Sequence, residues 1–474
     1  MRAALHIILA LSSFTLWGQQ IVAPIADSLF TIPKNLDSDH DHIQPAIRKM
    51  IDPKHCGKDS AHANVLVIKL ISDSYAQYDT AFRYRASVGF QGEWIGKKWY
   101  NRTRFLSGWN LREDHRQDHA FLLPLHNRKG YLYNDFRTRF SYTHNQILQT
   151  SFGVDQQFFG EGYRSLLQGD QIAPNPFAQM RVKFWRLEYG LLYQFFHAQD
   201  SLRYWKFQAS HYLSWNVTNH WNITLYEAVL FQPKDGNLRR GFEVEYLNPI
   251  AFFRPQEYSI GSADNVLLGA HTHVRLRKHT LYGQISLDEF VLGEIRNRTR
   301  WWANKYGVQI GAKGRLGQFG YRLEGNLIRP YTYSHINFGQ NSGNLNRPIG
   351  HPLGSNFAEI LAQLQWGKKH LKFTAYSVFV LKGYDQYSLS WGGDIYKPYT
   401  MRPADLEYGN TIGQGMTVRS IELGLSAQYP IPALPVKAYF QVAGRYQWGD
   451  IQARLDPILI LGIRSDLFSP RRLF

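Results

Sequence analysis

Residues 82–91 read Phe-Arg-Tyr-Arg-Ala-Ser-Val-Gly-Phe-Gln, so apolar or aromatic side chains alternate with polar or small ones. Successive side chains of a β-strand point to opposite faces of the sheet, and this stretch therefore predicts a strand with one apolar and one polar face. The same period of two recurs at residues 205–210, 281–288, 371–376, 421–427 and 436–442. The chain from residue 78 onward is predicted to be all-β.

The composition narrows the class of β-protein. Aromatic residues make up 15% of the chain, and the mean hydropathy is −0.37. A transmembrane barrel averages to mild polarity because its strands alternate lipid-facing and lumen-facing residues, and it carries aromatic residues at both membrane interfaces. A large soluble β-sandwich would show similar numbers. Beyond the N-terminus no stretch is apolar over the 18 or so residues that a membrane-spanning helix needs.

The two ends of the chain favour the barrel. Residues 1–18 combine one positive charge, a short apolar run and a small residue at Gly18, which predicts a cleaved secretory signal peptide. The chain ends in Arg471-Arg472-Leu473-Phe474, shortly after a strand candidate at 457–468. A terminal aromatic residue after a strand resembles the assembly signal of outer-membrane barrels. We therefore expect the outer membrane as the location and the barrel-assembly machinery as a partner during biogenesis.

The mature chain is predicted to have two parts. Residues 19–77 contain several prolines and the polar run 37–42, which indicate a periplasmic or lumenal segment with at most a short helix. We interpret the run 37–42 as a solvated linker rather than a metal site. Residues 78–474 are predicted to form the barrel, and about 395 residues at roughly 20 to 25 per strand and connection allow about 16 to 18 strands. Long segments such as 330–357 and 384–416 are expected outside the cell.

Charge and cysteine content limit the partners. The formal net charge is +17, and Cys56 is the only cysteine, so no intramolecular disulfide is possible. Nucleic acid is not expected as a partner of an exported barrel. Outer-membrane lipid, lipopolysaccharide or an acidic surface polysaccharide fits the excess of lysine and arginine. A simple positive bias of the lumen and rim is the alternative explanation.

Several motif blocks are not generic for barrels. The most distinctive is Gly160-Glu161-Gly162-Tyr163-Arg164-Ser165, and it is followed by the blocks 246–249, 261–269, 287–290, 301–307, 329–335, 351–356 and 407–410. In kind and in order these blocks resemble the capsule-assembly Wzi-like family, in the Bacteroidetes-type branch that includes gliding-motility-associated members. The likeness runs from about Tyr131 to the C-terminus. One departure is Gln168-Gly169-Asp170, which is polar where the family has a more apolar lead into the Asp.

The resemblance implies a fold and a function. It implies an antiparallel barrel of 18 strands with a lumen obstructed by loops and short helices, and a monomeric protein. It implies polysaccharide binding in capsule or exopolysaccharide assembly at the cell surface, without catalysis. A substrate-specific porin and an outer-membrane component of a gliding-motility, adhesion or secretion machinery are the alternatives.

The candidate site residues are charged, amide and aromatic side chains of these blocks. A charge that faces lipid costs ~2–4 kcal/mol at the bilayer midplane, so the charged members are expected inside the barrel or at its rim. There they would either brace a plug or contact a sugar. The candidates are Glu161, Tyr163, Arg164, Asp170, Arg254, Asp264, Asn265, Asp288, Glu289, Trp301, Trp302, Lys305, Arg329, Tyr331, Tyr333, His335 and Trp391. Arg164 is expected to pair with a carboxylate, with Glu161, Asp264, Asp288 and Glu289 as candidates.

An enzyme is not predicted. No Gly-x-Ser-x-Gly elbow in a strand-to-helix setting is present. Ser210 and His211 are adjacent, as are Ser334 and His335, and adjacent residues of a strand point to opposite faces. His271 and His273 share a face, but no third metal ligand is evident. No cofactor is predicted either.

Overall fold

The computed structural model describes residues 65–79, 81–96, 98–111, 121–124, 130–144, 147–197, 205–235, 238–239, 246, 264–368, 370–432 and 436–465. The predicted signal peptide, residues 19–64 and the C-terminal Phe474 lie outside these residues, and the predictions for them stay predictions.

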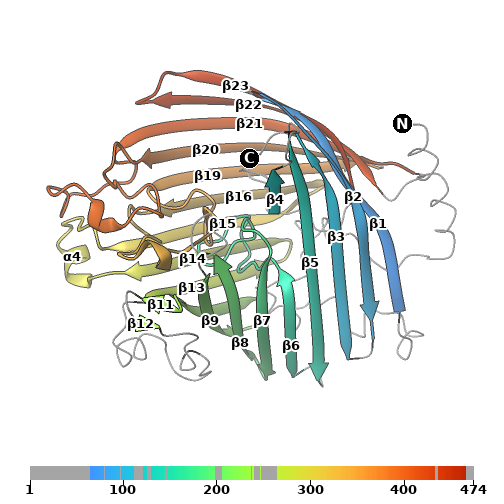
Figure 1. Ribbon diagram of the computed structural model, residues 1–474, viewed down its shortest axis with the longest axis horizontal. Helices are drawn as coiled ribbons and strands as arrows, with labels where there is room; N and C mark the ends of the chain where they lie inside the picture. The colour runs from blue at the N-terminus through green and yellow to red at the C-terminus, as the bar shows by residue number, and fades with distance from the viewer. Residues whose placement is uncertain are drawn as a thin grey trace.

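Within the described residues, eighteen strands form one closed antiparallel ring (Figure 1). The ring closes between the first and last strands, where Tyr75 pairs with Gly462. A further short strand, β4 (Phe121–Pro124), pairs only with β5. The eighteen strands are β1 (Val65–Tyr78), β2 (Phe82–Ile95), β3 (Trp99–Asn110), β5 (Tyr131–His144), β6 (Leu148–Asp155), β7 (Asn175–Phe184), β8 (Leu187–His197), β9 (Trp205–Asn216), β10 (Trp221–Phe231), β13 (Asn265–Leu276), β14 (His279–Glu289), β15 (Lys305–Leu316), β16 (Phe319–Ile328), β19 (Phe357–Lys368), β20 (Leu371–Tyr384), β21 (Met416–Pro430), β22 (Lys437–Gly449) and β23 (Arg454–Arg464). The predicted count is confirmed.

The barrel begins earlier than predicted. β1 starts at Val65, so residues 65–77 are part of the barrel wall and not of the N-terminal segment. The sequence pattern concealed this strand because the run 65–71 is apolar at every position except Lys69. Further along, Ile71 and Tyr75 point inward and are buried, so both faces of β1 carry apolar side chains.

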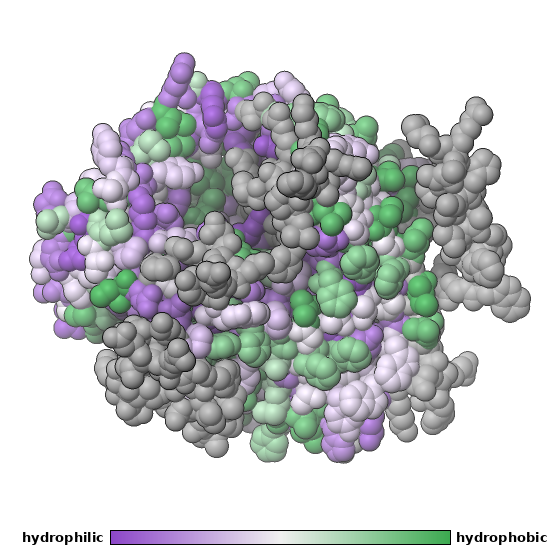
Figure 2. All heavy atoms as spheres, in the orientation of Figure 1, coloured by the Kyte–Doolittle hydropathy of each residue, from purple (hydrophilic) through white to green (hydrophobic). Residues whose placement is uncertain are grey.

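The strands alternate as predicted between an apolar outer face and a polar inner face. On β14 the outward Leu281 and Ile285 are exposed, whereas the inward Thr280 and Gln284 are buried. Hydrophobic side chains accordingly cover much of the barrel wall (Figure 2). Exposed apolar strand faces of this kind form the lipid-facing band of a membrane barrel.

Aromatic residues mark both ends of this band. At one end Trp366 stacks on Phe373, with ring centroids 5.4 Å apart. At the other end Tyr446 stacks on Trp448, also at 5.4 Å. Aromatic side chains at two levels are typical of the two membrane interfaces.

The connections are unequal at the two ends of the barrel. The long described connections are 156–174, 290–304, 329–356 and 385–415, and all lie at one end, which we call the loop end. Tight turns such as Trp185-Arg186 and Arg277-Lys278 lie at the opposite turn end, as does the start of β1. Long loops face the cell exterior in outer-membrane barrels. Among the described residues no helix is both long and apolar enough to cross a membrane.

The loop-end connections carry little regular structure. They include α4 (Leu292–Arg296), the 3₁₀ turns η5 (Phe338–Gln340) and η6 (Tyr399–Met401), and two small hairpins. The hairpins are β11 (Lys234–Asp235) with β12 (Leu238–Arg239), and β17 (Gly343–Asn344) with β18 (Arg347–Pro348).

The connection between β6 and β7, residues 156–174, lies against the inner wall; we call it the inner segment. Phe159, Leu166 and Leu167 are buried in one cluster with inward residues of several strands and with Tyr333 of the β16–β19 connection. Phe159 packs against Tyr226 of β10, with ring centroids 5.0 Å apart. The distinctive block of the sequence is therefore part of the barrel interior.

Candidate functional site

The Gly160–Ser165 block of the inner segment is held mainly by one carboxylate. Glu324 of β16 accepts the backbone N–H of Tyr163 at 2.6 Å and that of Arg164 at 3.0 Å. The Tyr282 hydroxyl donates to the same carboxylate at 2.7 Å. Glu324 is buried and points inward from its strand. A carboxylate that accepts several hydrogen bonds is a strong anchor because charge-assisted bonds are stronger than neutral ones.

The two glycines of the block permit this close approach. Gly160 has a φ of +113°, and a Cβ there would lie 2.0 Å from the Gln284 side chain. The neighbouring Gln284 donates to the Phe159 carbonyl at 2.9 Å. The positive φ and the Gln284 side chain both disfavour any residue other than glycine at this position.

Arg164 pairs with a carboxylate that the sequence analysis did not consider. Its guanidinium lies 3.5 Å from Glu359 of β19, and both side chains are buried. Glu359 also accepts from Asn326 at 2.9 Å and lies 3.0 Å from His351. The four candidates named from the sequence were wrong, because only closure of the barrel brings β19 to the inner segment.

Glu161 contacts two cations of the inner wall. Its carboxylate pairs with Lys313 of β15 and lies 3.6 Å from Arg275 of β13. Asp170, near the end of the inner segment, is half-buried. These contacts tie the inner segment to the wall and support the bracing interpretation for Glu161 and Arg164.

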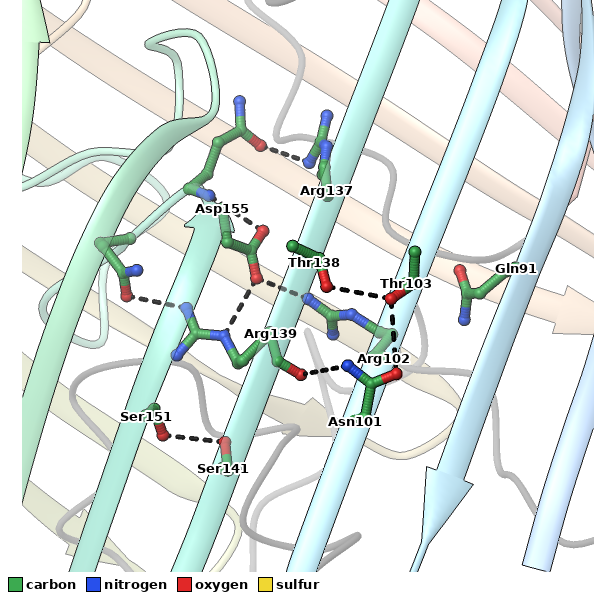
Figure 3. A network of polar contacts seen from close by, with 12 residues as sticks. Gln91, Asn101, Arg102, Thr103, Arg137, Thr138, Arg139, Ser141, Ser151 and Asp155 are labelled. Atoms are coloured by element: carbon green, nitrogen blue, oxygen red, sulfur yellow. Dashed lines mark hydrogen bonds and ion pairs between the residues drawn. The ribbon is translucent and has the colours of Figure 1, made fainter.

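A group of arginines on β3 and β5 holds the start of the inner segment (Figure 3). Arg102 lies directly opposite Arg139 in the strand register, and Arg104 lies opposite Arg137. Like charges placed opposite each other destabilise a sheet unless something neutralises them. Two buried aspartates have this role, and we call the six residues the arginine anchor: Arg102, Arg104, Arg137, Arg139, Asp135 and Asp155.

Asp155, the last residue of β6, accepts from Arg102 at 2.7 Å and from Arg139 at 3.0 Å. The next two residues extend the anchor into the inner segment. Gln156 accepts from Arg137 at 2.6 Å, and Gln157 accepts from Arg139 at 3.0 Å. The chain is thus bound to the wall at the point where it leaves the strand. The sequence analysis missed this group, although arginines at alternating positions of two successive strands were its signal.

A second group of residues lies at the loop end and is more exposed. Trp302 packs against Tyr399 with ring centroids 4.8 Å apart, and the Arg402 guanidinium lies 4.3 Å above the Trp302 ring. The Glu407 carboxylate accepts from the Trp301 indole and from Arg402, each at 2.7 Å. We call these five residues the loop-end platform. All are half-buried, and the Glu407 side chain is 42% exposed.

Buried charges lie beneath the platform. A β-bulge between Leu287 and Glu289 shifts the register of β14 and places Glu289 opposite Lys305. Lys305 is fully buried, 3.2 Å from Glu289 and 3.7 Å from Asp288. Its ammonium group lies 4.6 Å from the centre of the Tyr399 ring. The platform is therefore supported from below by a fixed cation.

Tyr331, Tyr333 and His335 connect this charged group to the inner segment. The Tyr333 backbone N–H donates to Asp288 at 2.8 Å, and its hydroxyl donates to the Leu166 carbonyl at 2.5 Å. The Tyr331 hydroxyl donates to the Ser390 carbonyl at 3.1 Å. Both tyrosines are fully buried, so they support the site and do not present their rings to a ligand.

His335 lies in the same buried environment. Burial, together with the Lys305 charge, lowers the pKa of its imidazole from 6.5 to about 4. The ring is therefore neutral at neutral pH. Its ring lies 6.2 Å from that of Tyr399, so it contributes to packing under the platform.

Of the remaining candidates, Arg329 contacts the platform and the others contact neighbouring parts of the structure. Asp264 accepts from Tyr246 at 2.7 Å and from Gln340 at 2.9 Å, and Asn265 donates to the Gln340 carbonyl. Arg329 donates to the Trp301 carbonyl at 3.1 Å. Trp391 has its backbone bonded to Asp385, and its buried indole N–H has no partner among the described residues. Arg254 lies outside the described residues.

The serine–histidine neighbours do not form nucleophile–base pairs. The Ser210 hydroxyl donates to the Leu192 carbonyl, whereas His211 lies 2.8 Å from Glu227. The Ser334 hydroxyl donates to the Tyr331 carbonyl at 2.6 Å. Strand geometry separates the first pair, as predicted. Among the described residues no group of three or more His, Cys, Asp or Glu side chains is placed to hold a metal ion.

The closed ring, the exposed apolar band and the unequal ends define the class: the chain is an outer-membrane β-barrel. No family model matches it, and no curated protein matches it in sequence. Its fold is similar to that of Wzi from Escherichia coli, described as a carbohydrate-binding β-barrel involved in group 1 capsule assembly. The TM-score is 0.57 at 13% identity, over 95% of this chain and 92% of that one.

Weaker structural matches are two barrels of Pseudomonas aeruginosa. OprD matches with a TM-score of 0.45 at 12% identity, over 84% of this chain and 94% of that one. OpdK, solved with vanillate, matches with a TM-score of 0.47 at 9% identity, over 84% of this chain and 97% of that one. The match to Wzi itself supports a Wzi-like fold.

Proposed function

We propose that this protein binds a surface polysaccharide at the loop-end platform and holds it at the cell surface without catalysis. The observation that carries the proposal is the platform itself. Trp302 and Tyr399 are partly exposed aromatic rings, packed together, in the same cluster as the half-exposed carboxylate of Glu407. An apolar surface with a few fixed polar groups is the usual composition of a small-molecule site. A sugar ring presents one apolar face and several hydroxyl donors, and both match this composition.

The charge of the site indicates the kind of polysaccharide. Arg402 lies over Trp302, and Lys305 lies beneath Tyr399. With a net charge of +17 for the whole chain, these cations favour an acidic polymer. The description of Wzi as a carbohydrate-binding capsule protein supports the same class of ligand. We further propose that the chain belongs to the Wzi-like family, and its motif blocks support this.

A binding measurement with the purified barrel tests the proposal. Acidic and neutral surface polysaccharides of the source cells would be titrated against the wild type, Trp302→Ala and Trp185→Ala. We expect Trp302→Ala to weaken binding of the acidic polymer by about tenfold, the loss of one aromatic contact of ~1.4 kcal/mol. Trp185 is an exposed tryptophan at the turn end and serves as the matched control. Equal loss with both variants, or no binding by the wild type, would reject the platform as the site.

A substrate-specific channel is the alternative function, because the inner strand faces are polar. Our proposal includes a lumen obstructed by the inner segment, so single-channel conductance of the refolded barrel separates the two. We expect little or no steady conductance. A large, steady conductance would favour the channel, and specific co-purification of motility, adhesion or secretion proteins would favour a role in such machinery.

A further inference from the structure

The connection between β14 and β15 presents an apolar and a cationic surface side by side. None of the residues of α4 is buried. Four large apolar side chains are exposed at this tip, and three arginines follow them within five positions. The apolar residues are Phe290, Val291, Leu292 and Ile295, and the cations are Arg296, Arg298 and Arg300. We call this set the α4 tip.

The α4 tip continues the lipid-facing band of the barrel. The tip directly follows β14, and the outward Leu281 and Ile285 of that strand belong to the band. Close to the tip, the outward Tyr306 of β15 pairs with Leu287 of β14. Tyrosine at the end of a membrane strand marks the interface. The tip therefore lies at the level of the outer-leaflet headgroups, and Figure 1 shows α4 beyond the strand ends.

Two of the three arginines occupy backbone positions that would suit glycine. α4 ends in a Schellman motif, since Arg298 N–H donates to the Ile295 carbonyl and Thr299 N–H to that of Glu294. Arg298, in the left-handed position that usually holds glycine, has a φ of +55°. Arg300 is also left-handed, with a φ of +57°. Arginine is thus kept at two positions where glycine would be less strained.

The three cations are available for a ligand. Among the described residues, none of Arg296, Arg298 and Arg300 forms an ion pair, although Glu294 lies within the same helix. The backbone that carries them is fixed, because Gly409 and Asn410 donate to the carbonyls of Thr299 and Arg300. Three exposed guanidinium groups on a fixed backbone, next to exposed apolar side chains, match a ligand with phosphates beside acyl chains.

We propose that the α4 tip is a binding site for a phosphorylated lipid of the outer leaflet, of the lipid A class. Phe290, Val291, Leu292 and Ile295 contact the acyl region, and the three arginines bind the headgroup phosphates. The α4 tip shares no residue with the loop-end platform. Lipid binding and polysaccharide binding are therefore tested separately. Its role is to fix the loop end of the barrel at the membrane surface.

The test compares lipids with and without phosphate, using the detergent-solubilised full barrel. Binding of diphosphorylated lipid A, dephosphorylated lipid A and inorganic phosphate would be measured for the wild type and for the triple variant Arg296→Ala, Arg298→Gly, Arg300→Gly. We expect the triple variant to bind diphosphorylated lipid A about 100-fold more weakly, at about fivefold for each cation. Dephosphorylated lipid A should bind both proteins equally and weakly.

Arg277→Gly is the matched control. Arg277 is an exposed arginine with a φ of +52° in the β13–β14 turn, at the opposite end of the same strand. Both glycine substitutions relieve the same backbone strain, so a purely structural role would make the two variants alike. We expect Arg277→Gly to leave lipid A affinity unchanged and Arg298→Gly to weaken it about fivefold, with no loss of heat stability in either.

Three results would reject the site: equal affinity of the wild type for both forms of lipid A, inorganic phosphate competing as well as the lipid, or a loss with Arg277→Gly that matches the loss with Arg298→Gly. Polysaccharide binding by the triple variant is measured in parallel. If it is retained while lipid A binding falls, the α4 tip and the platform are separate sites.

Discussion

The arginine anchor and the loop-end platform use the same residue types for different purposes. In the anchor, Asp155 is buried and accepts from two arginines, and the group continues directly into the inner segment. In the platform, Glu407 has one arginine and one indole as partners and is 42% exposed. Burial and the number of partners separate a bracing network from a surface that can exchange water for a ligand.

This contrast also divides the candidates chosen from the sequence. Glu161, Tyr163 and Arg164 belong to the bracing side, because their contacts are to the inner wall. Trp301 and Trp302 belong to the exposed side. A single list of charged and aromatic residues combined two environments that only burial distinguishes.

The largest effect is expected from Asp155→Asn. The change removes the charge between Arg102 and Arg139 and leaves buried guanidinium groups opposed, which should lower stability by about 3–5 kcal/mol. The heat-induced shift in electrophoretic mobility of the folded barrel measures it. Asp405→Asn is the control because Asp405 is exposed on the loop end. Unchanged stability of Asp155→Asn would contradict the bracing role of the anchor.

Arg164→Ala should have the next largest effect, about 2–3 kcal/mol. The ion pair with Glu359 is long, at 3.5 Å, but its loss leaves a buried carboxylate. We expect the melting transition to fall while polysaccharide affinity of the remaining folded protein changes less than twofold. Unaltered heat stability combined with lost binding would move Arg164 to the ligand-binding side of the comparison.

A pH dependence should appear beneath the platform. The pKa of His335 is about 4 in the folded protein, against 6.5 for the free side chain. When the β16–β19 connection, residues 329–356, opens locally, the exposed imidazole takes up a proton below pH 6.5. The folded connection therefore loses stability relative to the open one as pH falls from 6.5 to about 4. The protection factors of residues 329–356, which correct the exchange rates for the intrinsic pH dependence of amide exchange, should therefore fall in this range. His335→Gln should remove this loss of protection, and a persistent pH effect would assign it to another group.

The smallest effect on stability is expected from Glu407→Gln. Half-exposed ion pairs contribute about 0–1 kcal/mol, so the melting transition should barely move. Polysaccharide binding should nevertheless weaken, because the neutral glutamine amide accepts hydrogen bonds from sugar hydroxyls more weakly than the carboxylate does. A stability loss comparable to that of Asp155→Asn would show that the platform is another bracing network.

The alternation of residues 82–91 and its repeats predicted strands with one apolar and one polar face, and the two ends of the chain favoured a barrel over a β-sandwich. The resemblance to Wzi-like proteins gave the expected count of 18 strands. The pattern did not reveal that the wall begins at Val65, because β1 is apolar on both faces. Residue type alone therefore located the strands with a clear polar face and missed the one without it.

The sequence by itself determined which residues carry charge and aromatic surface, and it marked the Gly160–Ser165 block as special. Only the tertiary structure decided which carboxylates this block meets. Glu324 and Glu359 lie 160 or more residues beyond Arg164 of the block, and closure of the ring brings their strands to it. The same closure buries Tyr331 and Tyr333 and leaves Trp302 and Glu407 half-exposed. Burial is a property of neighbours in space, so no local pattern of residues could have assigned these roles.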